Sequence, residues 1–117
     1  MKARLVAFGV IEIEGRRYEH DVVIAAGRVR RRHKGPSKAL RDVYGHTPLS
    51  AAEDIPWGGT RLIVGTGHDG LLPVAPDVLA EAAPRRIEVV QVPTAEACTL
   101  LEAGDDAGVF AVLHVTC

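Results

Sequence analysis

The sequence predicts a single α/β domain with a mixed central sheet, and three observations support this fold class. The chain has 117 residues, enough for one domain and too few for two. Its first third alternates short apolar stretches with tight turns, which is typical of an antiparallel hairpin or meander. Its second half follows the order strand, helix, strand, helix, strand, which favours parallel strands joined by right-handed crossovers.

The N-terminal part is predicted to be an antiparallel meander with one solvated face. We expect strands at residues 4–8, 10–14, 18–25 and 28–33. Residues 10–14 alternate apolar and acidic side chains, which is the period of a half-exposed strand. Turns are expected at Gly9, at 15–17 and at 26–27, where glycine permits backbone conformations that other residues avoid.

The middle of the chain is predicted to be mainly loop. Residues 35–48 contain two glycines and two prolines, which interrupt regular structure. Ser50 and Glu53 have the spacing of a capping box, so a short helix is expected to start there and to end at Pro56.

The second half is predicted to form the parallel part of the sheet. The continuous apolar run at 62–64 is expected to be a strand buried on both faces. Helices are expected at 76–83, which begins with a proline, and at 95–103, where Thr94 is expected to cap the first turn. The remaining strands are expected at 87–92 and 109–115.

If these three strands are parallel, their carboxyl ends meet at one edge of the sheet. Ligands of open α/β sheets usually bind outside this edge. The candidate ligand-binding residues are therefore those that follow the strands: Gly65, Thr66, Gly67, His68, Thr94, His114 and Thr116.

The turn at 65–70 matches the pattern Gly-x-Gly-x-x-Gly, in which backbone N–H groups can approach a phosphate. It departs from a dinucleotide-binding site, because five residues separate it from the helix and no acidic residue ends the next strand. We expect no cofactor here. A purely structural turn and a nest for a small anion are both consistent with the pattern.

The histidines and cysteines do not predict a metal site. None of the five histidines pair at spacings of two or four residues. His114 and Cys117 are three apart on a predicted strand and therefore point to opposite faces. Cys117 is expected to be a buried thiol, and its use as a nucleophile would require a neighbouring base such as His68. No catalytic residue can be assigned.

Charge is distributed unevenly along the chain. Residues 1–58 carry 11 basic and 7 acidic side chains, whereas residues 59–117 carry 3 and 8. The basic run lacks interleaved aromatic residues, so we expect no nucleic acid partner. Its arginines are expected to form either a solvated face or a surface for an acidic protein partner, centred on Arg30, Arg31 and Arg32.

A cytoplasmic protein is expected. No apolar stretch reaches the 18 residues of a membrane span, and the N-terminus becomes charged too early for a signal peptide. Cys98 and Cys117 are too few for a disulfide scaffold and are expected to be free thiols. The chain is expected to be a monomer or a homodimer.

Several segments, in this order and spacing, resemble the Mth-type domain family of unknown function. They are Phe-Gly-Val-Ile-Glu-Ile-Glu-Gly-Arg-Arg-Tyr at 8–18, Leu-Ile-Val-Gly-Thr-Gly at 62–67, Val-Pro-Thr-Ala-Glu-Ala at 92–97 and Leu-His-Val-Thr-Cys at 113–117. The family includes the adipogenesis-associated Mth domain-containing protein and mitochondrial complex I assembly factor 3. The resemblance implies an α/β domain with an appended antiparallel part, no established enzymatic activity, and a shared pocket at the motifs around Gly65 and His114.

Two functions follow as hypotheses. The first is a non-enzymatic interaction or assembly module that recognises a protein partner through the arginines. It rests on the absence of a catalytic constellation. The second is a protein or enzyme that binds a small anion or small molecule at the sheet edge, where Thr66, Gly67 and His68 offer donors and His114 offers an acid–base group.

Overall fold

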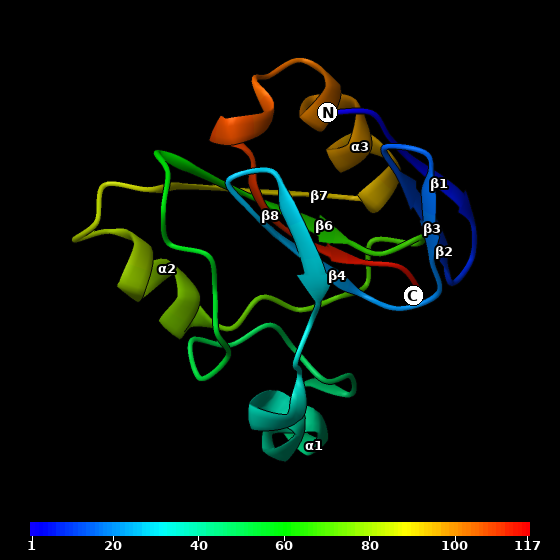
Figure 1. Cartoon of the computed structure of the whole chain (residues 1–117). Helices are drawn as coiled ribbons and strands as arrows, with labels where there is room; N and C mark the ends of the chain where they lie inside the picture. Colours follow the sequence, from blue (N-terminus) through cyan, green and yellow to red (C-terminus); the bar gives the residue numbers. More distant parts are fainter.

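The computed structural model describes residues 1–117 and confirms the single mixed α/β domain (Figure 1). A three-stranded antiparallel sheet consists of β1 (Ala3–Ala7), β2 (Val10–Ile13) and β3 (Arg16–Tyr18). A five-stranded sheet has the order β5-β4-β8-β6-β7, with β4 (Val22–Ala25), β5 (Arg28–Arg31), β6 (Arg61–Thr66), β7 (Glu88–Val92) and β8 (Phe110–His114).

The helices are few and short. They are α1 (Arg41–Tyr44), α2 (Pro76–Ala82) and α3 (Thr94–Glu102), together with the 3₁₀ helices η1 (Gly35–Leu40) and η2 (Asp106–Gly108). The short α1 lies at the opposite end of the molecule from α3 (Figure 1). No helix is long and apolar enough to cross a membrane.

The pairing within the five-stranded sheet confirms the predicted parallel half. Strand β6 lies between β7 and β8 and pairs in parallel with both. Strand β4 pairs antiparallel with β5 and also with β8. Through β4 the N-terminal segment therefore becomes part of the central sheet.

The predicted N-terminal meander is divided between two sheets. The predicted strand at 18–25 is in fact two strands, β3 and β4, because the chain leaves the first sheet after Tyr18 and enters the second at Val22. The turn expected at 15–17 is a two-residue hairpin turn at Glu14 and Gly15, both with positive φ. The turn at 26–27 is confirmed and has the same geometry.

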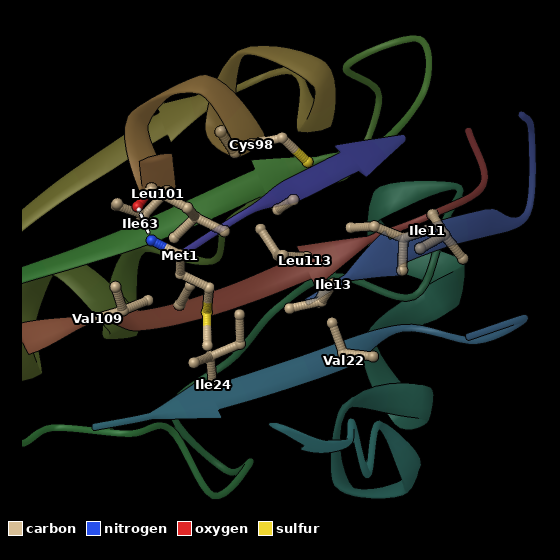
Figure 2. Packing of buried hydrophobic residues seen from close by; sticks show 14 residues of the cluster. Met1, Ile11, Ile13, Val22, Ile24, Ile63, Cys98, Leu101, Val109 and Leu113 are labelled. Carbon is tan, nitrogen blue, oxygen red and sulfur yellow. Dashed lines mark hydrogen bonds between the residues drawn. The ribbon is translucent and has the colours of Figure 1, made fainter. Parts of the chain in front are cut away.

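One face of the five-stranded sheet is covered by α3 and the three-stranded sheet. Figure 2 shows side chains from these elements converging in one apolar cluster. Leu101 and Cys98 come from α3, and Ile11 and Ile13 come from β2. Alternate residues of the central strands meet them, namely Val22 and Ile24 of β4, Ile63 of β6, and Ala111 and Leu113 of β8.

The opposite face is covered by α2 and by the long connection between α1 and β6. It carries the intervening strand residues Val23, Leu62, Val64 and Val112, which pack with Val78 of α2 and with Leu49, Ile55 and Leu72. Burial on both faces explains why the central strands are continuous apolar runs rather than alternating ones.

Three local expectations were wrong. Residues 35–48 are not mainly loop, since η1 and α1 occupy most of them. No helix starts at Ser50, because the Ser50 and Glu53 side chains are buried and bonded to groups other than a helix end. Thr94 lies inside α3 and does not cap it, because its hydroxyl bonds to the end of β8 instead.

Candidate functional site

Strand register places three ionisable residues in a row at one end of the five-stranded sheet. Val22 of β4 lies opposite Arg31 of β5 and opposite Leu113 of β8. One residue further along each strand, Asp21 therefore lies between Arg32 and His114, on the face that also carries Val23 and Val112. The carboxyl end of β8 thus meets two residues of the N-terminal hairpin.

Asp21 is the centre of this row. Its Oδ2 accepts hydrogen bonds from Nη1 of Arg32 at 2.9 Å and from Nδ1 of His114 at 2.8 Å. Its Oδ1 accepts the backbone N–H of Val115 at 2.9 Å. Burial of this carboxyl opposes its ionisation. The hydrogen bond and charge of His114, the backbone hydrogen bond from Val115 and the charge of Arg32 outweigh burial, so the pKa of Asp21 is lowered to about 2.

Arg32 connects Asp21 to a second buried carboxylate. Its Nε and Nη2 donate to the two oxygens of Glu53 at 2.7 and 2.8 Å, and Nη2 also donates to the Pro48 carbonyl at 3.0 Å. Ser37 of η1 donates to Glu53 at 2.5 Å and pairs with Ser50 at 2.7 Å. This buried network fastens η1 and the segment around Ser50 to the end of β5.

The network corrects the expected arginine face. The side chain of Arg32 is only 1% exposed, so a partner cannot reach it. Arg30 is half-buried and donates to the backbone carbonyl of Asp54 at 2.6 Å. Of the three arginines predicted to bind a partner, Arg31 alone is exposed and has no ion-pair partner.

The lowered pKa of Asp21 predicts acid sensitivity. A carboxyl whose pKa falls from 3.8 in the unfolded chain to about 2 in the folded protein stabilises the fold above pH 4. This contribution, about 2 kcal/mol, is lost as the pH falls from about 4 to 2. Urea unfolding of Asp21→Asn at a series of pH values should give a shallower decline over this window than the native chain, and an equal decline would contradict the assignment.

A cavity of about 510 Å³ opens beside this row and is called the basic cavity below. Its lining comes from the end of β8, from the segment after β5 and from η1 and α1: Arg32, Lys34, Lys38, Arg41, Gly45, His46, Thr47, His114, Thr116 and Cys117. No aspartate or glutamate side chain lines it. Lys34, Lys38 and Arg41 are exposed and form no ion pair anywhere in the chain.

The predicted glycine turn uses its backbone N–H groups within the protein. Gly67 N–H donates to the Thr94 hydroxyl, and the N–H groups of residues 68–72 donate to backbone carbonyls. Three of these carbonyl bonds go to Thr116 and Cys117, at 2.8 to 3.1 Å. The expectation of free donors for an anion nest is therefore wrong for this conformation, and the turn instead holds the chain segment that follows β8.

The seven residues predicted to bind a ligand divide into two groups. His114 and Thr116 line the basic cavity. Gly65, Thr66 and Thr94 are buried, and Thr94 links the turn to β8 by donating to the His114 carbonyl at 2.5 Å. Gly67 belongs to the same internal contact, and His68 is exposed beside Asp69 and Phe8. None of these five lines the basic cavity.

Sequence reasoning missed Asp21, Glu53 and the part of the cavity formed by η1 and α1. The sequence did contain one indication of the pairing between Asp21 and Arg32. A two-residue turn at 26–27 pairs residue 25 with 28, and continuing that register pairs Asp21 with Arg32. The contact with His114 had no such signal, because β8 joins β4 from the far end of the chain.

The two cysteines have different surroundings. Cys98 is buried in the core, and this burial raises the pKa of its thiol to about 11, so it is poorly reactive. Cys117 is partly exposed and lines the basic cavity. No group of three histidine, cysteine or acidic side chains is arranged to hold a metal ion.

Comparison with known proteins gives structural relatives without an assigned activity. No family model and no curated protein matches the chain. The crystal structure of conserved hypothetical protein PH1505 from Pyrococcus horikoshii OT3 matches at 34% identity and a TM-score of 0.76, over 100% of both chains. The protein MT938 matches at 27% identity and a TM-score of 0.63, over 95% of this chain and 94% of that one. Xanthomonas campestris XCC1710 shares the fold at 15% identity, with a TM-score of 0.59 over 98% of this chain and 84% of that one.

Proposed function

This chain belongs to the same family as the conserved hypothetical protein PH1505 of Pyrococcus horikoshii OT3, and we propose that this member binds a small polyanion in the basic cavity. The family supplies a fold and no reaction, so the proposal rests on the site. The observation that carries it is the gathering of Lys34, Lys38 and Arg41, none of them ion-paired, around one cavity without a carboxylate side chain.

Electrostatics supports this proposal. Like charges held in a concave site repel one another, and the potential they create attracts and concentrates anions. A ligand with two or more negative charges relieves the repulsion among the three cations. Arg32 adds little net charge, because Glu53 and Asp21 neutralise it. Its role is to keep the cavity wall in place.

The lining also restricts the chemistry of the ligand. A volume of about 510 Å³ lies within the range of pockets for small organic molecules. Cys117 is the one apolar residue of the lining, and the histidines provide its only rings. A ligand with an acyl chain would find little apolar side-chain surface, and a nucleobase would find only the histidine rings. A compact, highly charged ligand such as pyrophosphate or a small phosphorylated polyol fits better.

Charge reversal at Lys38 should weaken anion binding. We expect Lys38→Glu to raise the Kd for pyrophosphate at least tenfold, which corresponds to about 1.4 kcal/mol. Lys2→Glu is the matched control, since Lys2 is exposed, forms no ion pair and lies outside the basic cavity. Calorimetry at low and at physiological salt measures both variants. Equal affinity of Lys38→Glu and Lys2→Glu, or no binding by the native chain, would refute the proposal.

The interaction or assembly function is the second proposal, together with membership of the Mth-type family. Its support is the exposure of Arg31, which has no ion-pair partner, and of the separate apolar side chains of Phe8, Val43 and Leu71. The two proposals are compatible. The helix α1 carries both the exposed Val43 and Arg41 of the cavity lining. A partner protein bound at Val43 would therefore lie beside the basic cavity and could place an acidic group in it.

A further inference from the structure

Asp21, His114 and Thr116 form a hydrogen-bonded chain that ends in the basic cavity. Nδ1 of His114 lies 2.8 Å from Oδ2 of Asp21, and Nε2 lies 3.2 Å from the hydroxyl of Thr116. His114 and Thr116 line the cavity, whereas Asp21 does not. The chain therefore runs from a partly buried carboxylate, through an imidazole, to a hydroxyl beside the space for a ligand.

The carboxylate decides which nitrogen of His114 can exchange its proton. An ionised carboxylate only accepts hydrogen bonds, so Nδ1 must carry a proton and donate it to Asp21. Asp21 stays ionised across the neutral range, since its pKa is about 2. Nε2 is then the atom that gains or loses a proton, and it is the nitrogen on the side of the cavity.

Protonation of Nε2 also changes what Thr116 can do. When Nε2 is unprotonated, it accepts the hydroxyl proton of Thr116, so that proton is not available to a ligand. When Nε2 carries a proton, it no longer accepts, and the Thr116 hydroxyl is free to rotate and donate to an anion. One proton on His114 thus adds a positive charge and releases a hydroxyl donor.

The charged groups around His114 couple this proton to ligand binding. Asp21 lies against Nδ1 of the ring, while Arg32, Lys34, Lys38, Arg41, His46 and the Cys117 thiol line the same cavity. With the cavity empty, the field of the unpaired cations is not offset by an anion. A bound dianion reverses the sign of that field, so binding and protonation stabilise each other.

The arrangement of donors favours a tetrahedral oxyanion. The lining residues that carry donor groups come from the end of β8, from η1 and from α1 and the segment after it, so they are not confined to one element. A planar carboxylate accepts mainly near its own plane, whereas the oxygens of a phosphoryl group accept all round. A phosphate monoester also has a second ionisation near pH 6, so it can exchange a proton with an imidazole close to neutrality.

Building on the proposed anion binding, we propose that Nε2 of His114 is the proton-exchanging atom of the basic cavity and that its ligand is a phosphate ester or a polyphosphate. Binding of the dianionic form draws a proton onto His114 and frees the Thr116 hydroxyl to donate to the phosphoryl oxygens. Asp21 acts as a positioning residue, since it orients the ring and does not face the ligand.

The test measures proton uptake on binding by calorimetry in buffers of different ionisation enthalpy, at pH 7.5. Inorganic sulfate is the first probe, because it carries no exchangeable proton at this pH and any uptake belongs to the protein. Pyrophosphate and phenyl phosphate are the second and third probes. We expect the native chain to take up a substantial fraction of one proton with sulfate, and to bind both phosphoryl probes at least tenfold more tightly than citrate.

Two variants test whether the proton taken up on anion binding goes to His114. His114→Asn keeps an amide donor near Asp21 and removes the titrating nitrogen, so it should bind sulfate more weakly and take up at least twofold less proton. His46→Asn is the matched control and should retain most of the uptake. Imidazole NMR of the native chain should show Nε2 of His114 becoming protonated as sulfate is added, which a structural role for the ring would not produce.

The outcomes separate this inference from the proposed function. Anion binding without proton uptake, or uptake that survives in His114→Asn and disappears in His46→Asn, overturns the role of His114 and leaves the anion site standing. Tighter binding of citrate than of the phosphoryl probes overturns the ligand class. Absence of binding by all four anions overturns both proposals.

Discussion

Replacing Arg32 by methionine should lower the free energy of unfolding by about 3 to 5 kcal/mol, the largest effect expected of any single substitution in this chain. The guanidinium donates to Glu53 through two nitrogens and to Asp21 through a third, and its side chain is only 1% exposed. Methionine fills much of the space but leaves the buried carboxylate of Glu53 without its cation and removes one donor from the partly buried carboxylate of Asp21. A domain of this size has about 5 to 15 kcal/mol in total, so the loss is a large fraction of its stability.

Urea unfolding monitored by circular dichroism measures this effect. Arg31→Met is the matched control, because it removes an exposed arginine from the neighbouring position and should change stability by less than about 0.5 kcal/mol. Arg32→Lys keeps the charge but loses the bidentate contact with Glu53, so its free energy of unfolding should lie between those of Arg32→Met and Arg31→Met. If Arg32→Met were as stable as Arg31→Met, the buried network would not hold η1 in place as described.

Replacing Gly67 by alanine is expected to have the second largest effect, a loss of at least about 2 kcal/mol. Gly67 has a φ of +110°, which side-chain-bearing residues rarely adopt. A Cβ atom there would also come within 2.4 Å of the Thr116 carbonyl oxygen and of the Cys117 carbonyl carbon. These are backbone atoms, so the contact cannot be relieved by rotating a side chain.

Gly70→Ala separates the two causes of this effect. Gly70 also has a positive φ, of +71°, but a Cβ atom there would approach no other atom closer than 3.5 Å. Gly70→Ala should therefore lower the free energy of unfolding by about 1 kcal/mol, the cost of placing alanine at a positive φ. Thermal unfolding of both variants gives the comparison. Equal destabilisation would show that the approach of the segment after β8 does not constrain Gly67.

The Gly67→Ala variant should also weaken anion binding if it folds. His68, Asp69 and Leu71 donate their N–H groups to Thr116 and Cys117, so a shift of the turn moves the segment that carries Thr116. Thr116 and Cys117 line the basic cavity. The glycine-rich turn therefore positions part of the cavity lining through its contacts with Thr116 and Cys117.

Much of the fold could be predicted from local patterns. The apolar runs, the proline at the start of α2 and the glycines of the turns marked nearly every strand and two of the helices, and the alternation of strands and helices predicted the parallel pairing. The errors lie where a polar residue has a distant partner. Thr94 matched a helix cap, and Ser50 with Glu53 matched a capping box, yet each side chain bonds to a residue far away in sequence.

The candidate site could be predicted only in part, for the same reason. The parallel topology predicted a ligand site at the carboxyl edge of the sheet, and of the seven residues named there only His114 and Thr116 line the basic cavity. The glycine turn at this edge was interpreted either as a structural turn or as a nest for a small anion, because local sequence shows donors but not their acceptors. Its N–H groups are used by Thr116 and Cys117, about 45 residues further along the chain.

The sequence by itself determined the fold class and the burial of the central strands, since hydrophobic period and turn residues are local properties. The tertiary structure decided which charges are buried and which are free. Arg32 and Lys38 are similar in sequence, both basic and in one run, yet Arg32 is neutralised inside the network and Lys38 faces the cavity. That difference depends on β8 pairing with β4, which brings His114 from the end of the chain against Asp21.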